Sequence, residues 1–284
     1  MKHLKIKIFF ERIGVLPFMK NLITKTFLKL KNENKPALVT YTVAGDPNKN
    51  QSLALLKKIS KYADIVEWGF PHNCPTADGK EIQNSSYRAL ENGIKLNDIF
   101  DLVKKYKKDK NAKPLILMGY YQMVFNYGEK RFVKRCKQVG VDGLIIVDLI
   151  WPYNKKFANL CKKKSICFVQ LIAPTTTGQR IRKIIKDSHD MIYYISMLST
   201  TGGKLKVTPK TILKNYNKIK KINKNKNIVV GFGITDKTIS SLKKTDGLVV
   251  GSALVKTITD SLNHKRSTLI AAEQMVKKLK AKIT

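Results

Sequence analysis

The 284-residue sequence lacks three features that define common classes of protein: long apolar runs, paired cysteines and abundant arginine. No apolar run approaches the ~20 residues that a bilayer-spanning helix needs, so we expect no membrane segment. The four cysteines lack the spacing of a zinc site or a disulfide framework, which favours reduced thiols in a cytosolic compartment. His72 and Cys74 near Asp78 would need a second cluster to ligate a metal; none follows, so we expect no metal.

Arginine is scarce although the chain is strongly basic. The net charge is +35, but 48 of the 55 basic residues are Lys and only seven are Arg. Nucleic-acid-binding proteins rely on Arg for bidentate and stacked contacts. We therefore expect no specific nucleic-acid binding, although an anionic small-molecule substrate would be attracted. The excess of Lys, Asn and Ile fits an AT-rich genome, so we expect a cytoplasmic protein of a bacterium or endosymbiont, with a plastid as the alternative.

The first 18 residues are basic and partly apolar, but they lack the apolar core and cleavage site of a secretory signal. Either residues 1–18 form an N-terminal extension or Met19 is the true start. No linker or low-complexity break divides residues 19–284. We expect them to form one domain, because α/β barrels commonly run to about 250 residues.

Short β-rich runs alternate with amphipathic, lysine-faced helical stretches along the chain. This is the pattern of βα units around a parallel sheet. Eight strands at fairly regular spacing favour a single (β/α)8 TIM barrel over an open sheet. The expected strands are 37–43, 64–69, 114–120, 143–148, 167–173, 191–196, 227–232 and 247–250. The expected helices are 51–61, 98–108, 130–139, 154–164, 179–186, 209–222, 237–244 and 269–280.

One carboxylate, Glu67, lies in an apolar run that otherwise predicts a buried strand, and a second, Asp78, follows on a loop marked by Pro and Gly. Because an unpaired charge is costly to remove from water, such a carboxyl needs a partner, a shifted pKa or a catalytic role. Active sites of barrel enzymes lie at the carboxyl ends of the strands, where this strand meets its loop. The pair indicates an acid/base site. A buried lysine partner for Glu67 and an ordinary Asp-Gly turn are the structural alternatives.

Glycine-rich turns follow the last two expected strands. They are Gly231-Phe-Gly233 and Gly251, which precedes Ser252 at the expected start of a helix. In this fold, backbone N–H groups at such turns and at a helix N-terminus commonly hold a phosphate. Tight βα turns also use glycine for their geometry alone. The pattern therefore favours a phosphorylated ligand without requiring one.

Five motifs occur in order along the chain: Tyr41-Thr-Val-Ala-Gly-Asp-Pro47, Glu67-x-Gly-x-Pro71, Pro75-x-Ala-Asp-Gly79, Gly231-Phe-Gly-Ile234 and Val250-Gly-Ser-Ala253. Together they resemble the tryptophan synthase alpha subunit family. The resemblance implies a (β/α)8 lyase that cleaves indole-3-glycerol phosphate to indole and glyceraldehyde 3-phosphate in L-tryptophan biosynthesis. It implies no cofactor in this chain. It also implies a beta subunit, which carries pyridoxal phosphate and receives the indole, in an α2β2 complex.

The resemblance also implies roles for individual residues. Glu67 resembles the family's catalytic acid/base, and Asp78 resembles the carboxylate that holds the indole N–H. Thr201 resembles the residue that orients that carboxylate when the loops close. Residues that would flank the indole are Tyr41, Tyr193 and Phe232, although the tyrosines alone would more often be core or rim aromatics. Residues that would hold the phosphate are Gly202, Gly233, Gly251 and Ser252.

Several loops depart from the family's usual pattern. The second loop, usually close to Pro-Phe-Ser-Asp-Pro, reads Pro71-His-Asn-Cys-Pro75. The third, usually Tyr-x-Asn-Pro, reads Tyr121-Gln-Met-Val124; Ile150 follows Asp-Leu in the fourth, and Ser199 replaces a glycine in the sixth. These loops form much of the face that meets the beta subunit, so either the partner has co-varied or selection has relaxed. The second hypothesis is therefore a catalytically weak allosteric partner that activates the beta subunit.

Overall fold

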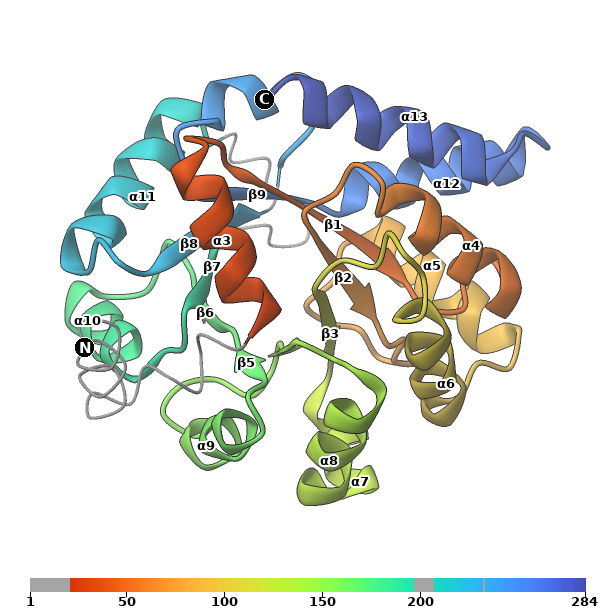
Figure 1. Ribbon diagram of the computed structural model, residues 1–284, viewed down its shortest axis with the longest axis horizontal. Helices are drawn as coiled ribbons and strands as arrows, with labels where there is room; N and C mark the ends of the chain where they lie inside the picture. The colour runs from red at the N-terminus through yellow and green to blue at the C-terminus, as the bar shows by residue number, and fades with distance from the viewer. Residues whose placement is uncertain (1–20, 197–206, 232) are drawn as a thin grey trace, which may run out of the picture.

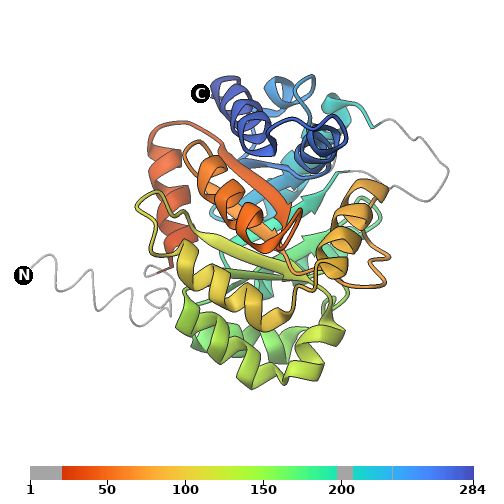
Figure 2. The ribbon, with the colours of Figure 1, turned by 90° about the vertical axis from the view of Figure 1, so that its right-hand side faces the viewer.

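The computed structural model describes residues 21–196, 207–231 and 233–284. In this part of the chain, parallel strands form one sheet in the order β5-β4-β3-β2-β1-β9-β8-β7-β6. The helices lie around the outside of the strands (Figure 1 and Figure 2). The strands are β1 (Ala37–Val43), β2 (Ile65–Gly69), β3 (Leu115–Gly119), β4 (Gly143–Ile146), β5 (Cys167–Phe168), β6 (Gln170–Ile172), β7 (Met191–Ile195), β8 (Asn227–Gly231) and β9 (Gly247–Val250).

The two edge strands of this sheet, β5 and β6, are halves of one chain segment. β5 pairs with β4 through Gly143 and Cys167, and β6 pairs with β7 through Gln170 and Ile192. Only Val169 separates the halves, and its N–H still donates to the Leu144 carbonyl at 2.9 Å. The segment therefore joins both edges and closes the sheet. The predicted (β/α)8 barrel is confirmed, with its fifth strand divided in two.

The helices follow the expected alternation, with a few corrections. They are α3 (Leu22–Asn32), α4 (Lys49–Ile59), α5 (Lys80–Glu91), α6 (Leu96–Tyr106), α7 (Tyr121–Tyr127), α8 (Glu129–Val139), α9 (Lys155–Lys163), α10 (Gly178–Asp187), α11 (Pro209–Ile222), α12 (Ser252–Asn263) and α13 (Thr268–Ala281). The expected helix 237–244 is only a 3₁₀ turn, η1 (Ile239–Leu242), whose buried residues are spaced by three. Across the described ranges, each helix is too short or too polar to cross a bilayer.

Three helices were not expected from the sequence: α3, α5 and α7. In α5 the buried positions are Ser85, Ser86 and Ala89, so apolar periodicity gives little signal. α7 is only 7 residues long, with a single buried residue, Val124. α12 begins at Ser252, as its sequence suggested.

One end of the barrel is closed by α3, which lies across the opening in Figure 1. Its residues Ile23, Phe27 and Leu30 belong to the apolar cluster inside the barrel, together with Val39 of β1 and Ile65 of β2. A second, larger cluster fills the space between the strands and the outer helices. Because the amino-terminal end is filled, a ligand can enter only from the carboxyl ends of the strands.

The loop after β1 is anchored to α5 by a buried carboxylate. Asp46 accepts hydrogen bonds from Arg88 Nε at 2.9 Å and Nη2 at 2.8 Å, and from the Ser85 hydroxyl. Arg88 also donates to the Thr259 hydroxyl of α12 at 3.0 Å. The guanidinium thus ties together three parts of the barrel rim around a charge that water does not reach.

Removing this guanidinium should cost more stability than removing an exposed one. We expect Arg88→Ala to lower the free energy of unfolding by about 3 kcal/mol, because Asp46 would stay buried and keep, among the described side chains, only its hydrogen bond from Ser85. Arg135→Ala is the matched control: its pair with Asp101, at 3.0 Å, is 35% and 63% exposed, so the loss should stay below about 1 kcal/mol. Denaturant unfolding measures both losses. Equal losses would contradict the claim that Arg88 stabilises the buried Asp46 carboxylate.

Candidate functional site

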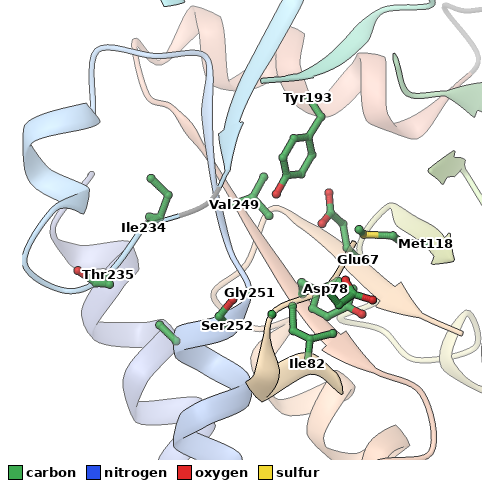
Figure 3. Close-up of a pocket in the computed structure, with 14 residues that line it drawn as sticks. Glu67, Asp78, Ile82, Met118, Tyr193, Ile234, Thr235, Val249, Gly251 and Ser252 are labelled. Atoms are coloured by element: carbon green, nitrogen blue, oxygen red, sulfur yellow. The ribbon is translucent and has the colours of Figure 1, made fainter. Parts of the chain in front are cut away.

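A pocket of about 280 Å³ lies at the carboxyl ends of the strands (Figure 3). Its lining residues come from β1, β2, β3, β7 and β9, from the loop after β2 and the start of α5, and from the turns after β8 and β9 with the start of α12. They are Tyr41, Glu67, Asp78, Gly79, Ile82, Met118, Tyr193, Gly233, Ile234, Thr235, Val249, Gly251, Ser252 and Ala253. All the predicted site residues that the structure describes are in this lining. Thr201, Gly202 and Phe232 lie outside the described residues.

Glu67 sits in the middle of β2, and its side chain points into the pocket (Figure 3). The residue is 1% exposed, and within the described residues its Oε1 atom has no hydrogen-bond partner. Burial raises the pKa of this carboxyl from 4.5 to about 8. No lysine offsets the burial among the described side chains, so the structural alternative of a buried ion pair is not supported. At neutral pH the group is therefore mostly protonated.

Asp78 lies on the loop after β2 and is held from several sides. The Asp78 N–H donates to the Pro75 carbonyl at 3.0 Å, and the side-chain amide of Gln83, on α5, donates to the Asp78 backbone carbonyl at 2.9 Å. The Tyr120 hydroxyl donates to Asp78 Oδ2 at 3.0 Å and accepts from the Ala77 N–H at 3.0 Å. Burial raises the pKa of Asp78 to about 6, while the Tyr120 hydrogen bond lowers it. Asp78 is thus ionised at neutral pH, unlike Glu67.

Tyr120 is a site residue that the sequence reasoning missed. It directly follows β3, at the end of the strand where barrel enzymes place functional groups. A hydroxyl-bearing side chain at that position was the available signal. Its partner could not be inferred, because the contact joins residues 42 positions apart.

Two glycines make room for the tyrosines of the pocket. A Cβ atom on Gly69 would lie 2.2 Å from the Tyr41 hydroxyl oxygen, and one on Gly231 would lie 1.9 Å from that of Tyr193. Both tyrosines are buried, and burial, with the nearby Glu67 and Asp78, raises their pKa values well above the ordinary range. In Figure 3 the Tyr193 hydroxyl points toward the Glu67 carboxyl. Both phenols therefore stay protonated and can donate hydrogen bonds.

The opposite side of the pocket is formed by backbone. Gly251 is the N-cap of α12 and makes no side-chain cap, so the first N–H groups of this 12-residue helix are available to a ligand. Gly233 has a φ of +69°, a conformation that favours glycine. The described lining contains no Lys or Arg. An anion bound here would be held by N–H groups and the helix dipole.

No group of three or more His, Cys, Asp or Glu side chains in the described part of the chain is arranged to hold a metal ion. In the His72/Cys74 pair considered from the sequence, His72 Nδ1 accepts a hydrogen bond from the Cys74 backbone N–H at 3.0 Å.

A pocket at the carboxyl end of a closed parallel barrel is typical of a TIM-barrel enzyme, and its two carboxyl groups with different pKa values indicate acid/base chemistry. The family model described as tryptophan synthase alpha chain matches residues 27–284. The chain belongs to the tryptophan synthase alpha chain family.

Individual relatives agree with this assignment. The chain is 62% identical to the tryptophan synthase alpha chain of Pelagibacter ubique (strain HTCC1062), over 93% of this chain and 100% of the relative. It is 39% identical to that of Thermococcus kodakarensis, over 81% of this chain and 91% of the relative. A crystal structure of tryptophan synthase subunit alpha from Legionella pneumophila str. Paris matches with a TM-score of 0.85 at 30% identity, over 93% and 98% of the two chains.

Family membership confirms the resemblance found in the sequence. The chain is a tryptophan synthase alpha chain in function: a lyase that acts on indole-3-glycerol phosphate in tryptophan biosynthesis. This alpha reaction uses no cofactor, and pyridoxal phosphate resides in the beta chain.

The raised pKa of Glu67 should make the stability of the protein depend on pH. The pKa of about 8 in the folded protein exceeds the ordinary value of 4.5. The contribution of protonated Glu67 to the free energy of unfolding is therefore fully present below pH 4.5 and is lost as pH rises through 8. We expect Glu67→Gln to gain stability relative to wild type from pH 5 to pH 8, by a few kcal/mol in total. Thermal unfolding of both proteins across this range measures the gap. A gap that does not change with pH would contradict the raised pKa.

Proposed function

We propose that Glu67 is the acid/base group of the carbon–carbon bond cleavage and that Asp78 holds the indole N–H. The observation that carries the proposal is the buried Glu67 carboxyl, whose Oε1 has no hydrogen-bond partner among the described residues and whose pKa is raised to about 8. A protonated Glu67 donates its proton to C3 of the indole ring and becomes a carboxylate. That carboxylate then takes the proton of the side-chain hydroxyl, which becomes the aldehyde as the C–C bond breaks.

The negative charge of Asp78 stabilises the intermediate of the same step. Protonation of C3 leaves a positive charge on the indolenine nitrogen, and an ionised carboxylate beside the N–H stabilises it. The electrons of the broken bond return to the ring and release neutral indole. Asp78 is ionised above about pH 6 and Glu67 protonated below about pH 8. The active form of the free enzyme is therefore expected between these values.

The proposal places the phosphate of the substrate at Gly233, Gly251 and Ser252. The uncapped start of α12 and the absence of a basic side chain in the described lining support backbone binding. Tyr41 and Tyr193 would flank the indole from the opposite walls of the pocket. Three further residues, which lie outside the described ranges, are proposed from the family resemblance alone. Thr201 would orient Asp78, Phe232 would contact the indole and Gly202 would contact the phosphate.

Replacing either carboxyl should abolish indole release. We expect Glu67→Gln to lower kcat by about a hundredfold or more, because one group supplies both proton transfers. Asp78→Asn should lower kcat strongly as well, because the amide cannot balance the indolenine charge. Indole release from indole-3-glycerol phosphate measures both. Glu91→Gln, an exposed carboxyl of α5, serves as control, and near-normal turnover by Glu67→Gln would overturn the assignment.

We propose further that the chain works in an α2β2 complex with a beta subunit, which docks on the loops after β2, β3 and β4. Three large side chains are exposed there: Phe125 at 66%, Ile150 at 52% and Tyr153 at 79%. The Tyr121 N–H donates to Asp148 Oδ1 at 2.8 Å, which ties α7 to the loop after β4. Exposed large apolar side chains on the loops after β3 and β4 suit contact with a partner protein.

Polar substitutions on this surface should weaken assembly and leave the isolated chain folded. We expect Phe125→Ser with Tyr153→Ser to shift an equimolar mixture with the beta subunit from the α2β2 mass toward its separate components in sedimentation. The control is Ile270→Ser on α13, which is 56% exposed on a different helix. Unchanged assembly of the double variant would place the beta subunit elsewhere.

A further inference from the structure

Two residues of the altered loops contact each other. His72 lies in the loop after β2, and Gln122 lies in the first turn of α7, and both loops depart from the family's usual pattern. His72 Nε2 is 3.0 Å from Gln122 Oε1, and the Cys74 N–H donates to His72 Nδ1 at 3.0 Å. Because Nδ1 accepts, the ring carries its proton on Nε2 and donates it to Gln122.

The His72 ring also covers Tyr120. The two rings are stacked, with centroids 5.0 Å apart and planes inclined by 29°. Tyr120 in turn donates to Asp78 Oδ2 and accepts from the Ala77 N–H, both at 3.0 Å. A continuous set of contacts therefore runs from Gln122 through His72 and Tyr120 to the carboxylate of the pocket.

We infer that His72 and Gln122 form a positioning clamp, which holds the Tyr120 ring in place and thereby sets the orientation and ionisation of Asp78. The inference rests on the proposed role of Asp78. Neither clamp residue lines the pocket, and the stacked Tyr120 ring links them to the Asp78 carboxylate. The alternative route, through the loop that His72 Nδ1 holds at the Cys74 N–H, is separated from this one by the Tyr120→Phe background in the test below. The clamp joins two altered loops to each other.

The inference has a direct consequence for the ionisation of Asp78. The Tyr120 hydrogen bond lowers the pKa of Asp78 against the effect of burial. If the ring turns away, this hydrogen bond is lost and the pKa of Asp78 rises. The other titratable groups facing Asp78 are Glu67, Tyr41 and Tyr193, and the clamp variants leave all three unchanged. A clamp that only stabilised the exposed loop would change the amount of folded protein and not this pKa.

The test is the pH profile of kcat/KM for indole release by His72→Ala, with Asn73→Ala as control. We expect His72→Ala to lower kcat/KM at neutral pH roughly three- to tenfold, the effect of losing about one hydrogen bond. We also expect its acid limb to move to higher pH. The substrate phosphate titrates near pH 6 with every variant, so the difference between profiles belongs to the enzyme. Asn73 is exposed in the same loop, and its variant should match wild type.

Three further variants make the test specific. His72→Phe keeps a ring on Tyr120 and should restore most of the position of the acid limb, whereas Gln122→Ala should shift the limb in the same direction as His72→Ala. In a Tyr120→Phe background, His72→Ala should cause no further shift, because the hydroxyl through which it acts is gone. An unmoved limb in His72→Ala, or an undiminished shift in the Tyr120→Phe background, would overturn the clamp. Normal indole release by Asp78→Asn would instead overturn the proposed function.

Discussion

Burial of the Glu67 carboxyl in the wall of the barrel opposes folding, and the rest of the site is built around that unfavourable position. The carboxyl is almost completely shielded from water, and its Oε1 has no hydrogen-bond partner in the part of the chain that the structure describes. Its proton is retained because ionisation in an apolar wall costs free energy. The rest of the barrel offsets this cost: the divided fifth strand closes the sheet, and apolar residues of α3 fill its amino-terminal end.

The two carboxyl groups differ because their surroundings differ. Glu67 stands on a strand, and its Oε1 has no hydrogen-bond partner among the described residues, whereas Asp78 stands on a loop and accepts a hydrogen bond from Tyr120. One environment favours the neutral acid and the other favours the anion, so a single pocket can both deliver a proton and stabilise a positive charge. α5 holds two loops at the rim of the barrel: Gln83 donates to the loop that carries Asp78, and Arg88 donates to Asp46 in the loop after β1.

Much of this could be predicted from the sequence, because its strongest signals are local. The strands 37–43 and 247–250 were predicted with the bounds that the structure gives, and Glu67 stood out as a charge within an apolar run. α5 was missed because it buries serines, and Tyr120 because its partner is distant in sequence. The contact between His72 and Gln122 could not be foreseen either. The two residues are 50 positions apart in the sequence, and only the fold brings their loops together.

The most direct test of the account is a titration of Glu67 itself in the free protein. Carboxyl carbon NMR with labelled glutamate, assigned by comparison with Glu67→Gln, reports the protonation of this one group. The account predicts a midpoint near 8, so that the acid is mostly protonated at neutral pH. A midpoint near the ordinary value of 4.5 would contradict it, because a carboxylate already ionised at neutral pH could not supply the proton that releases indole.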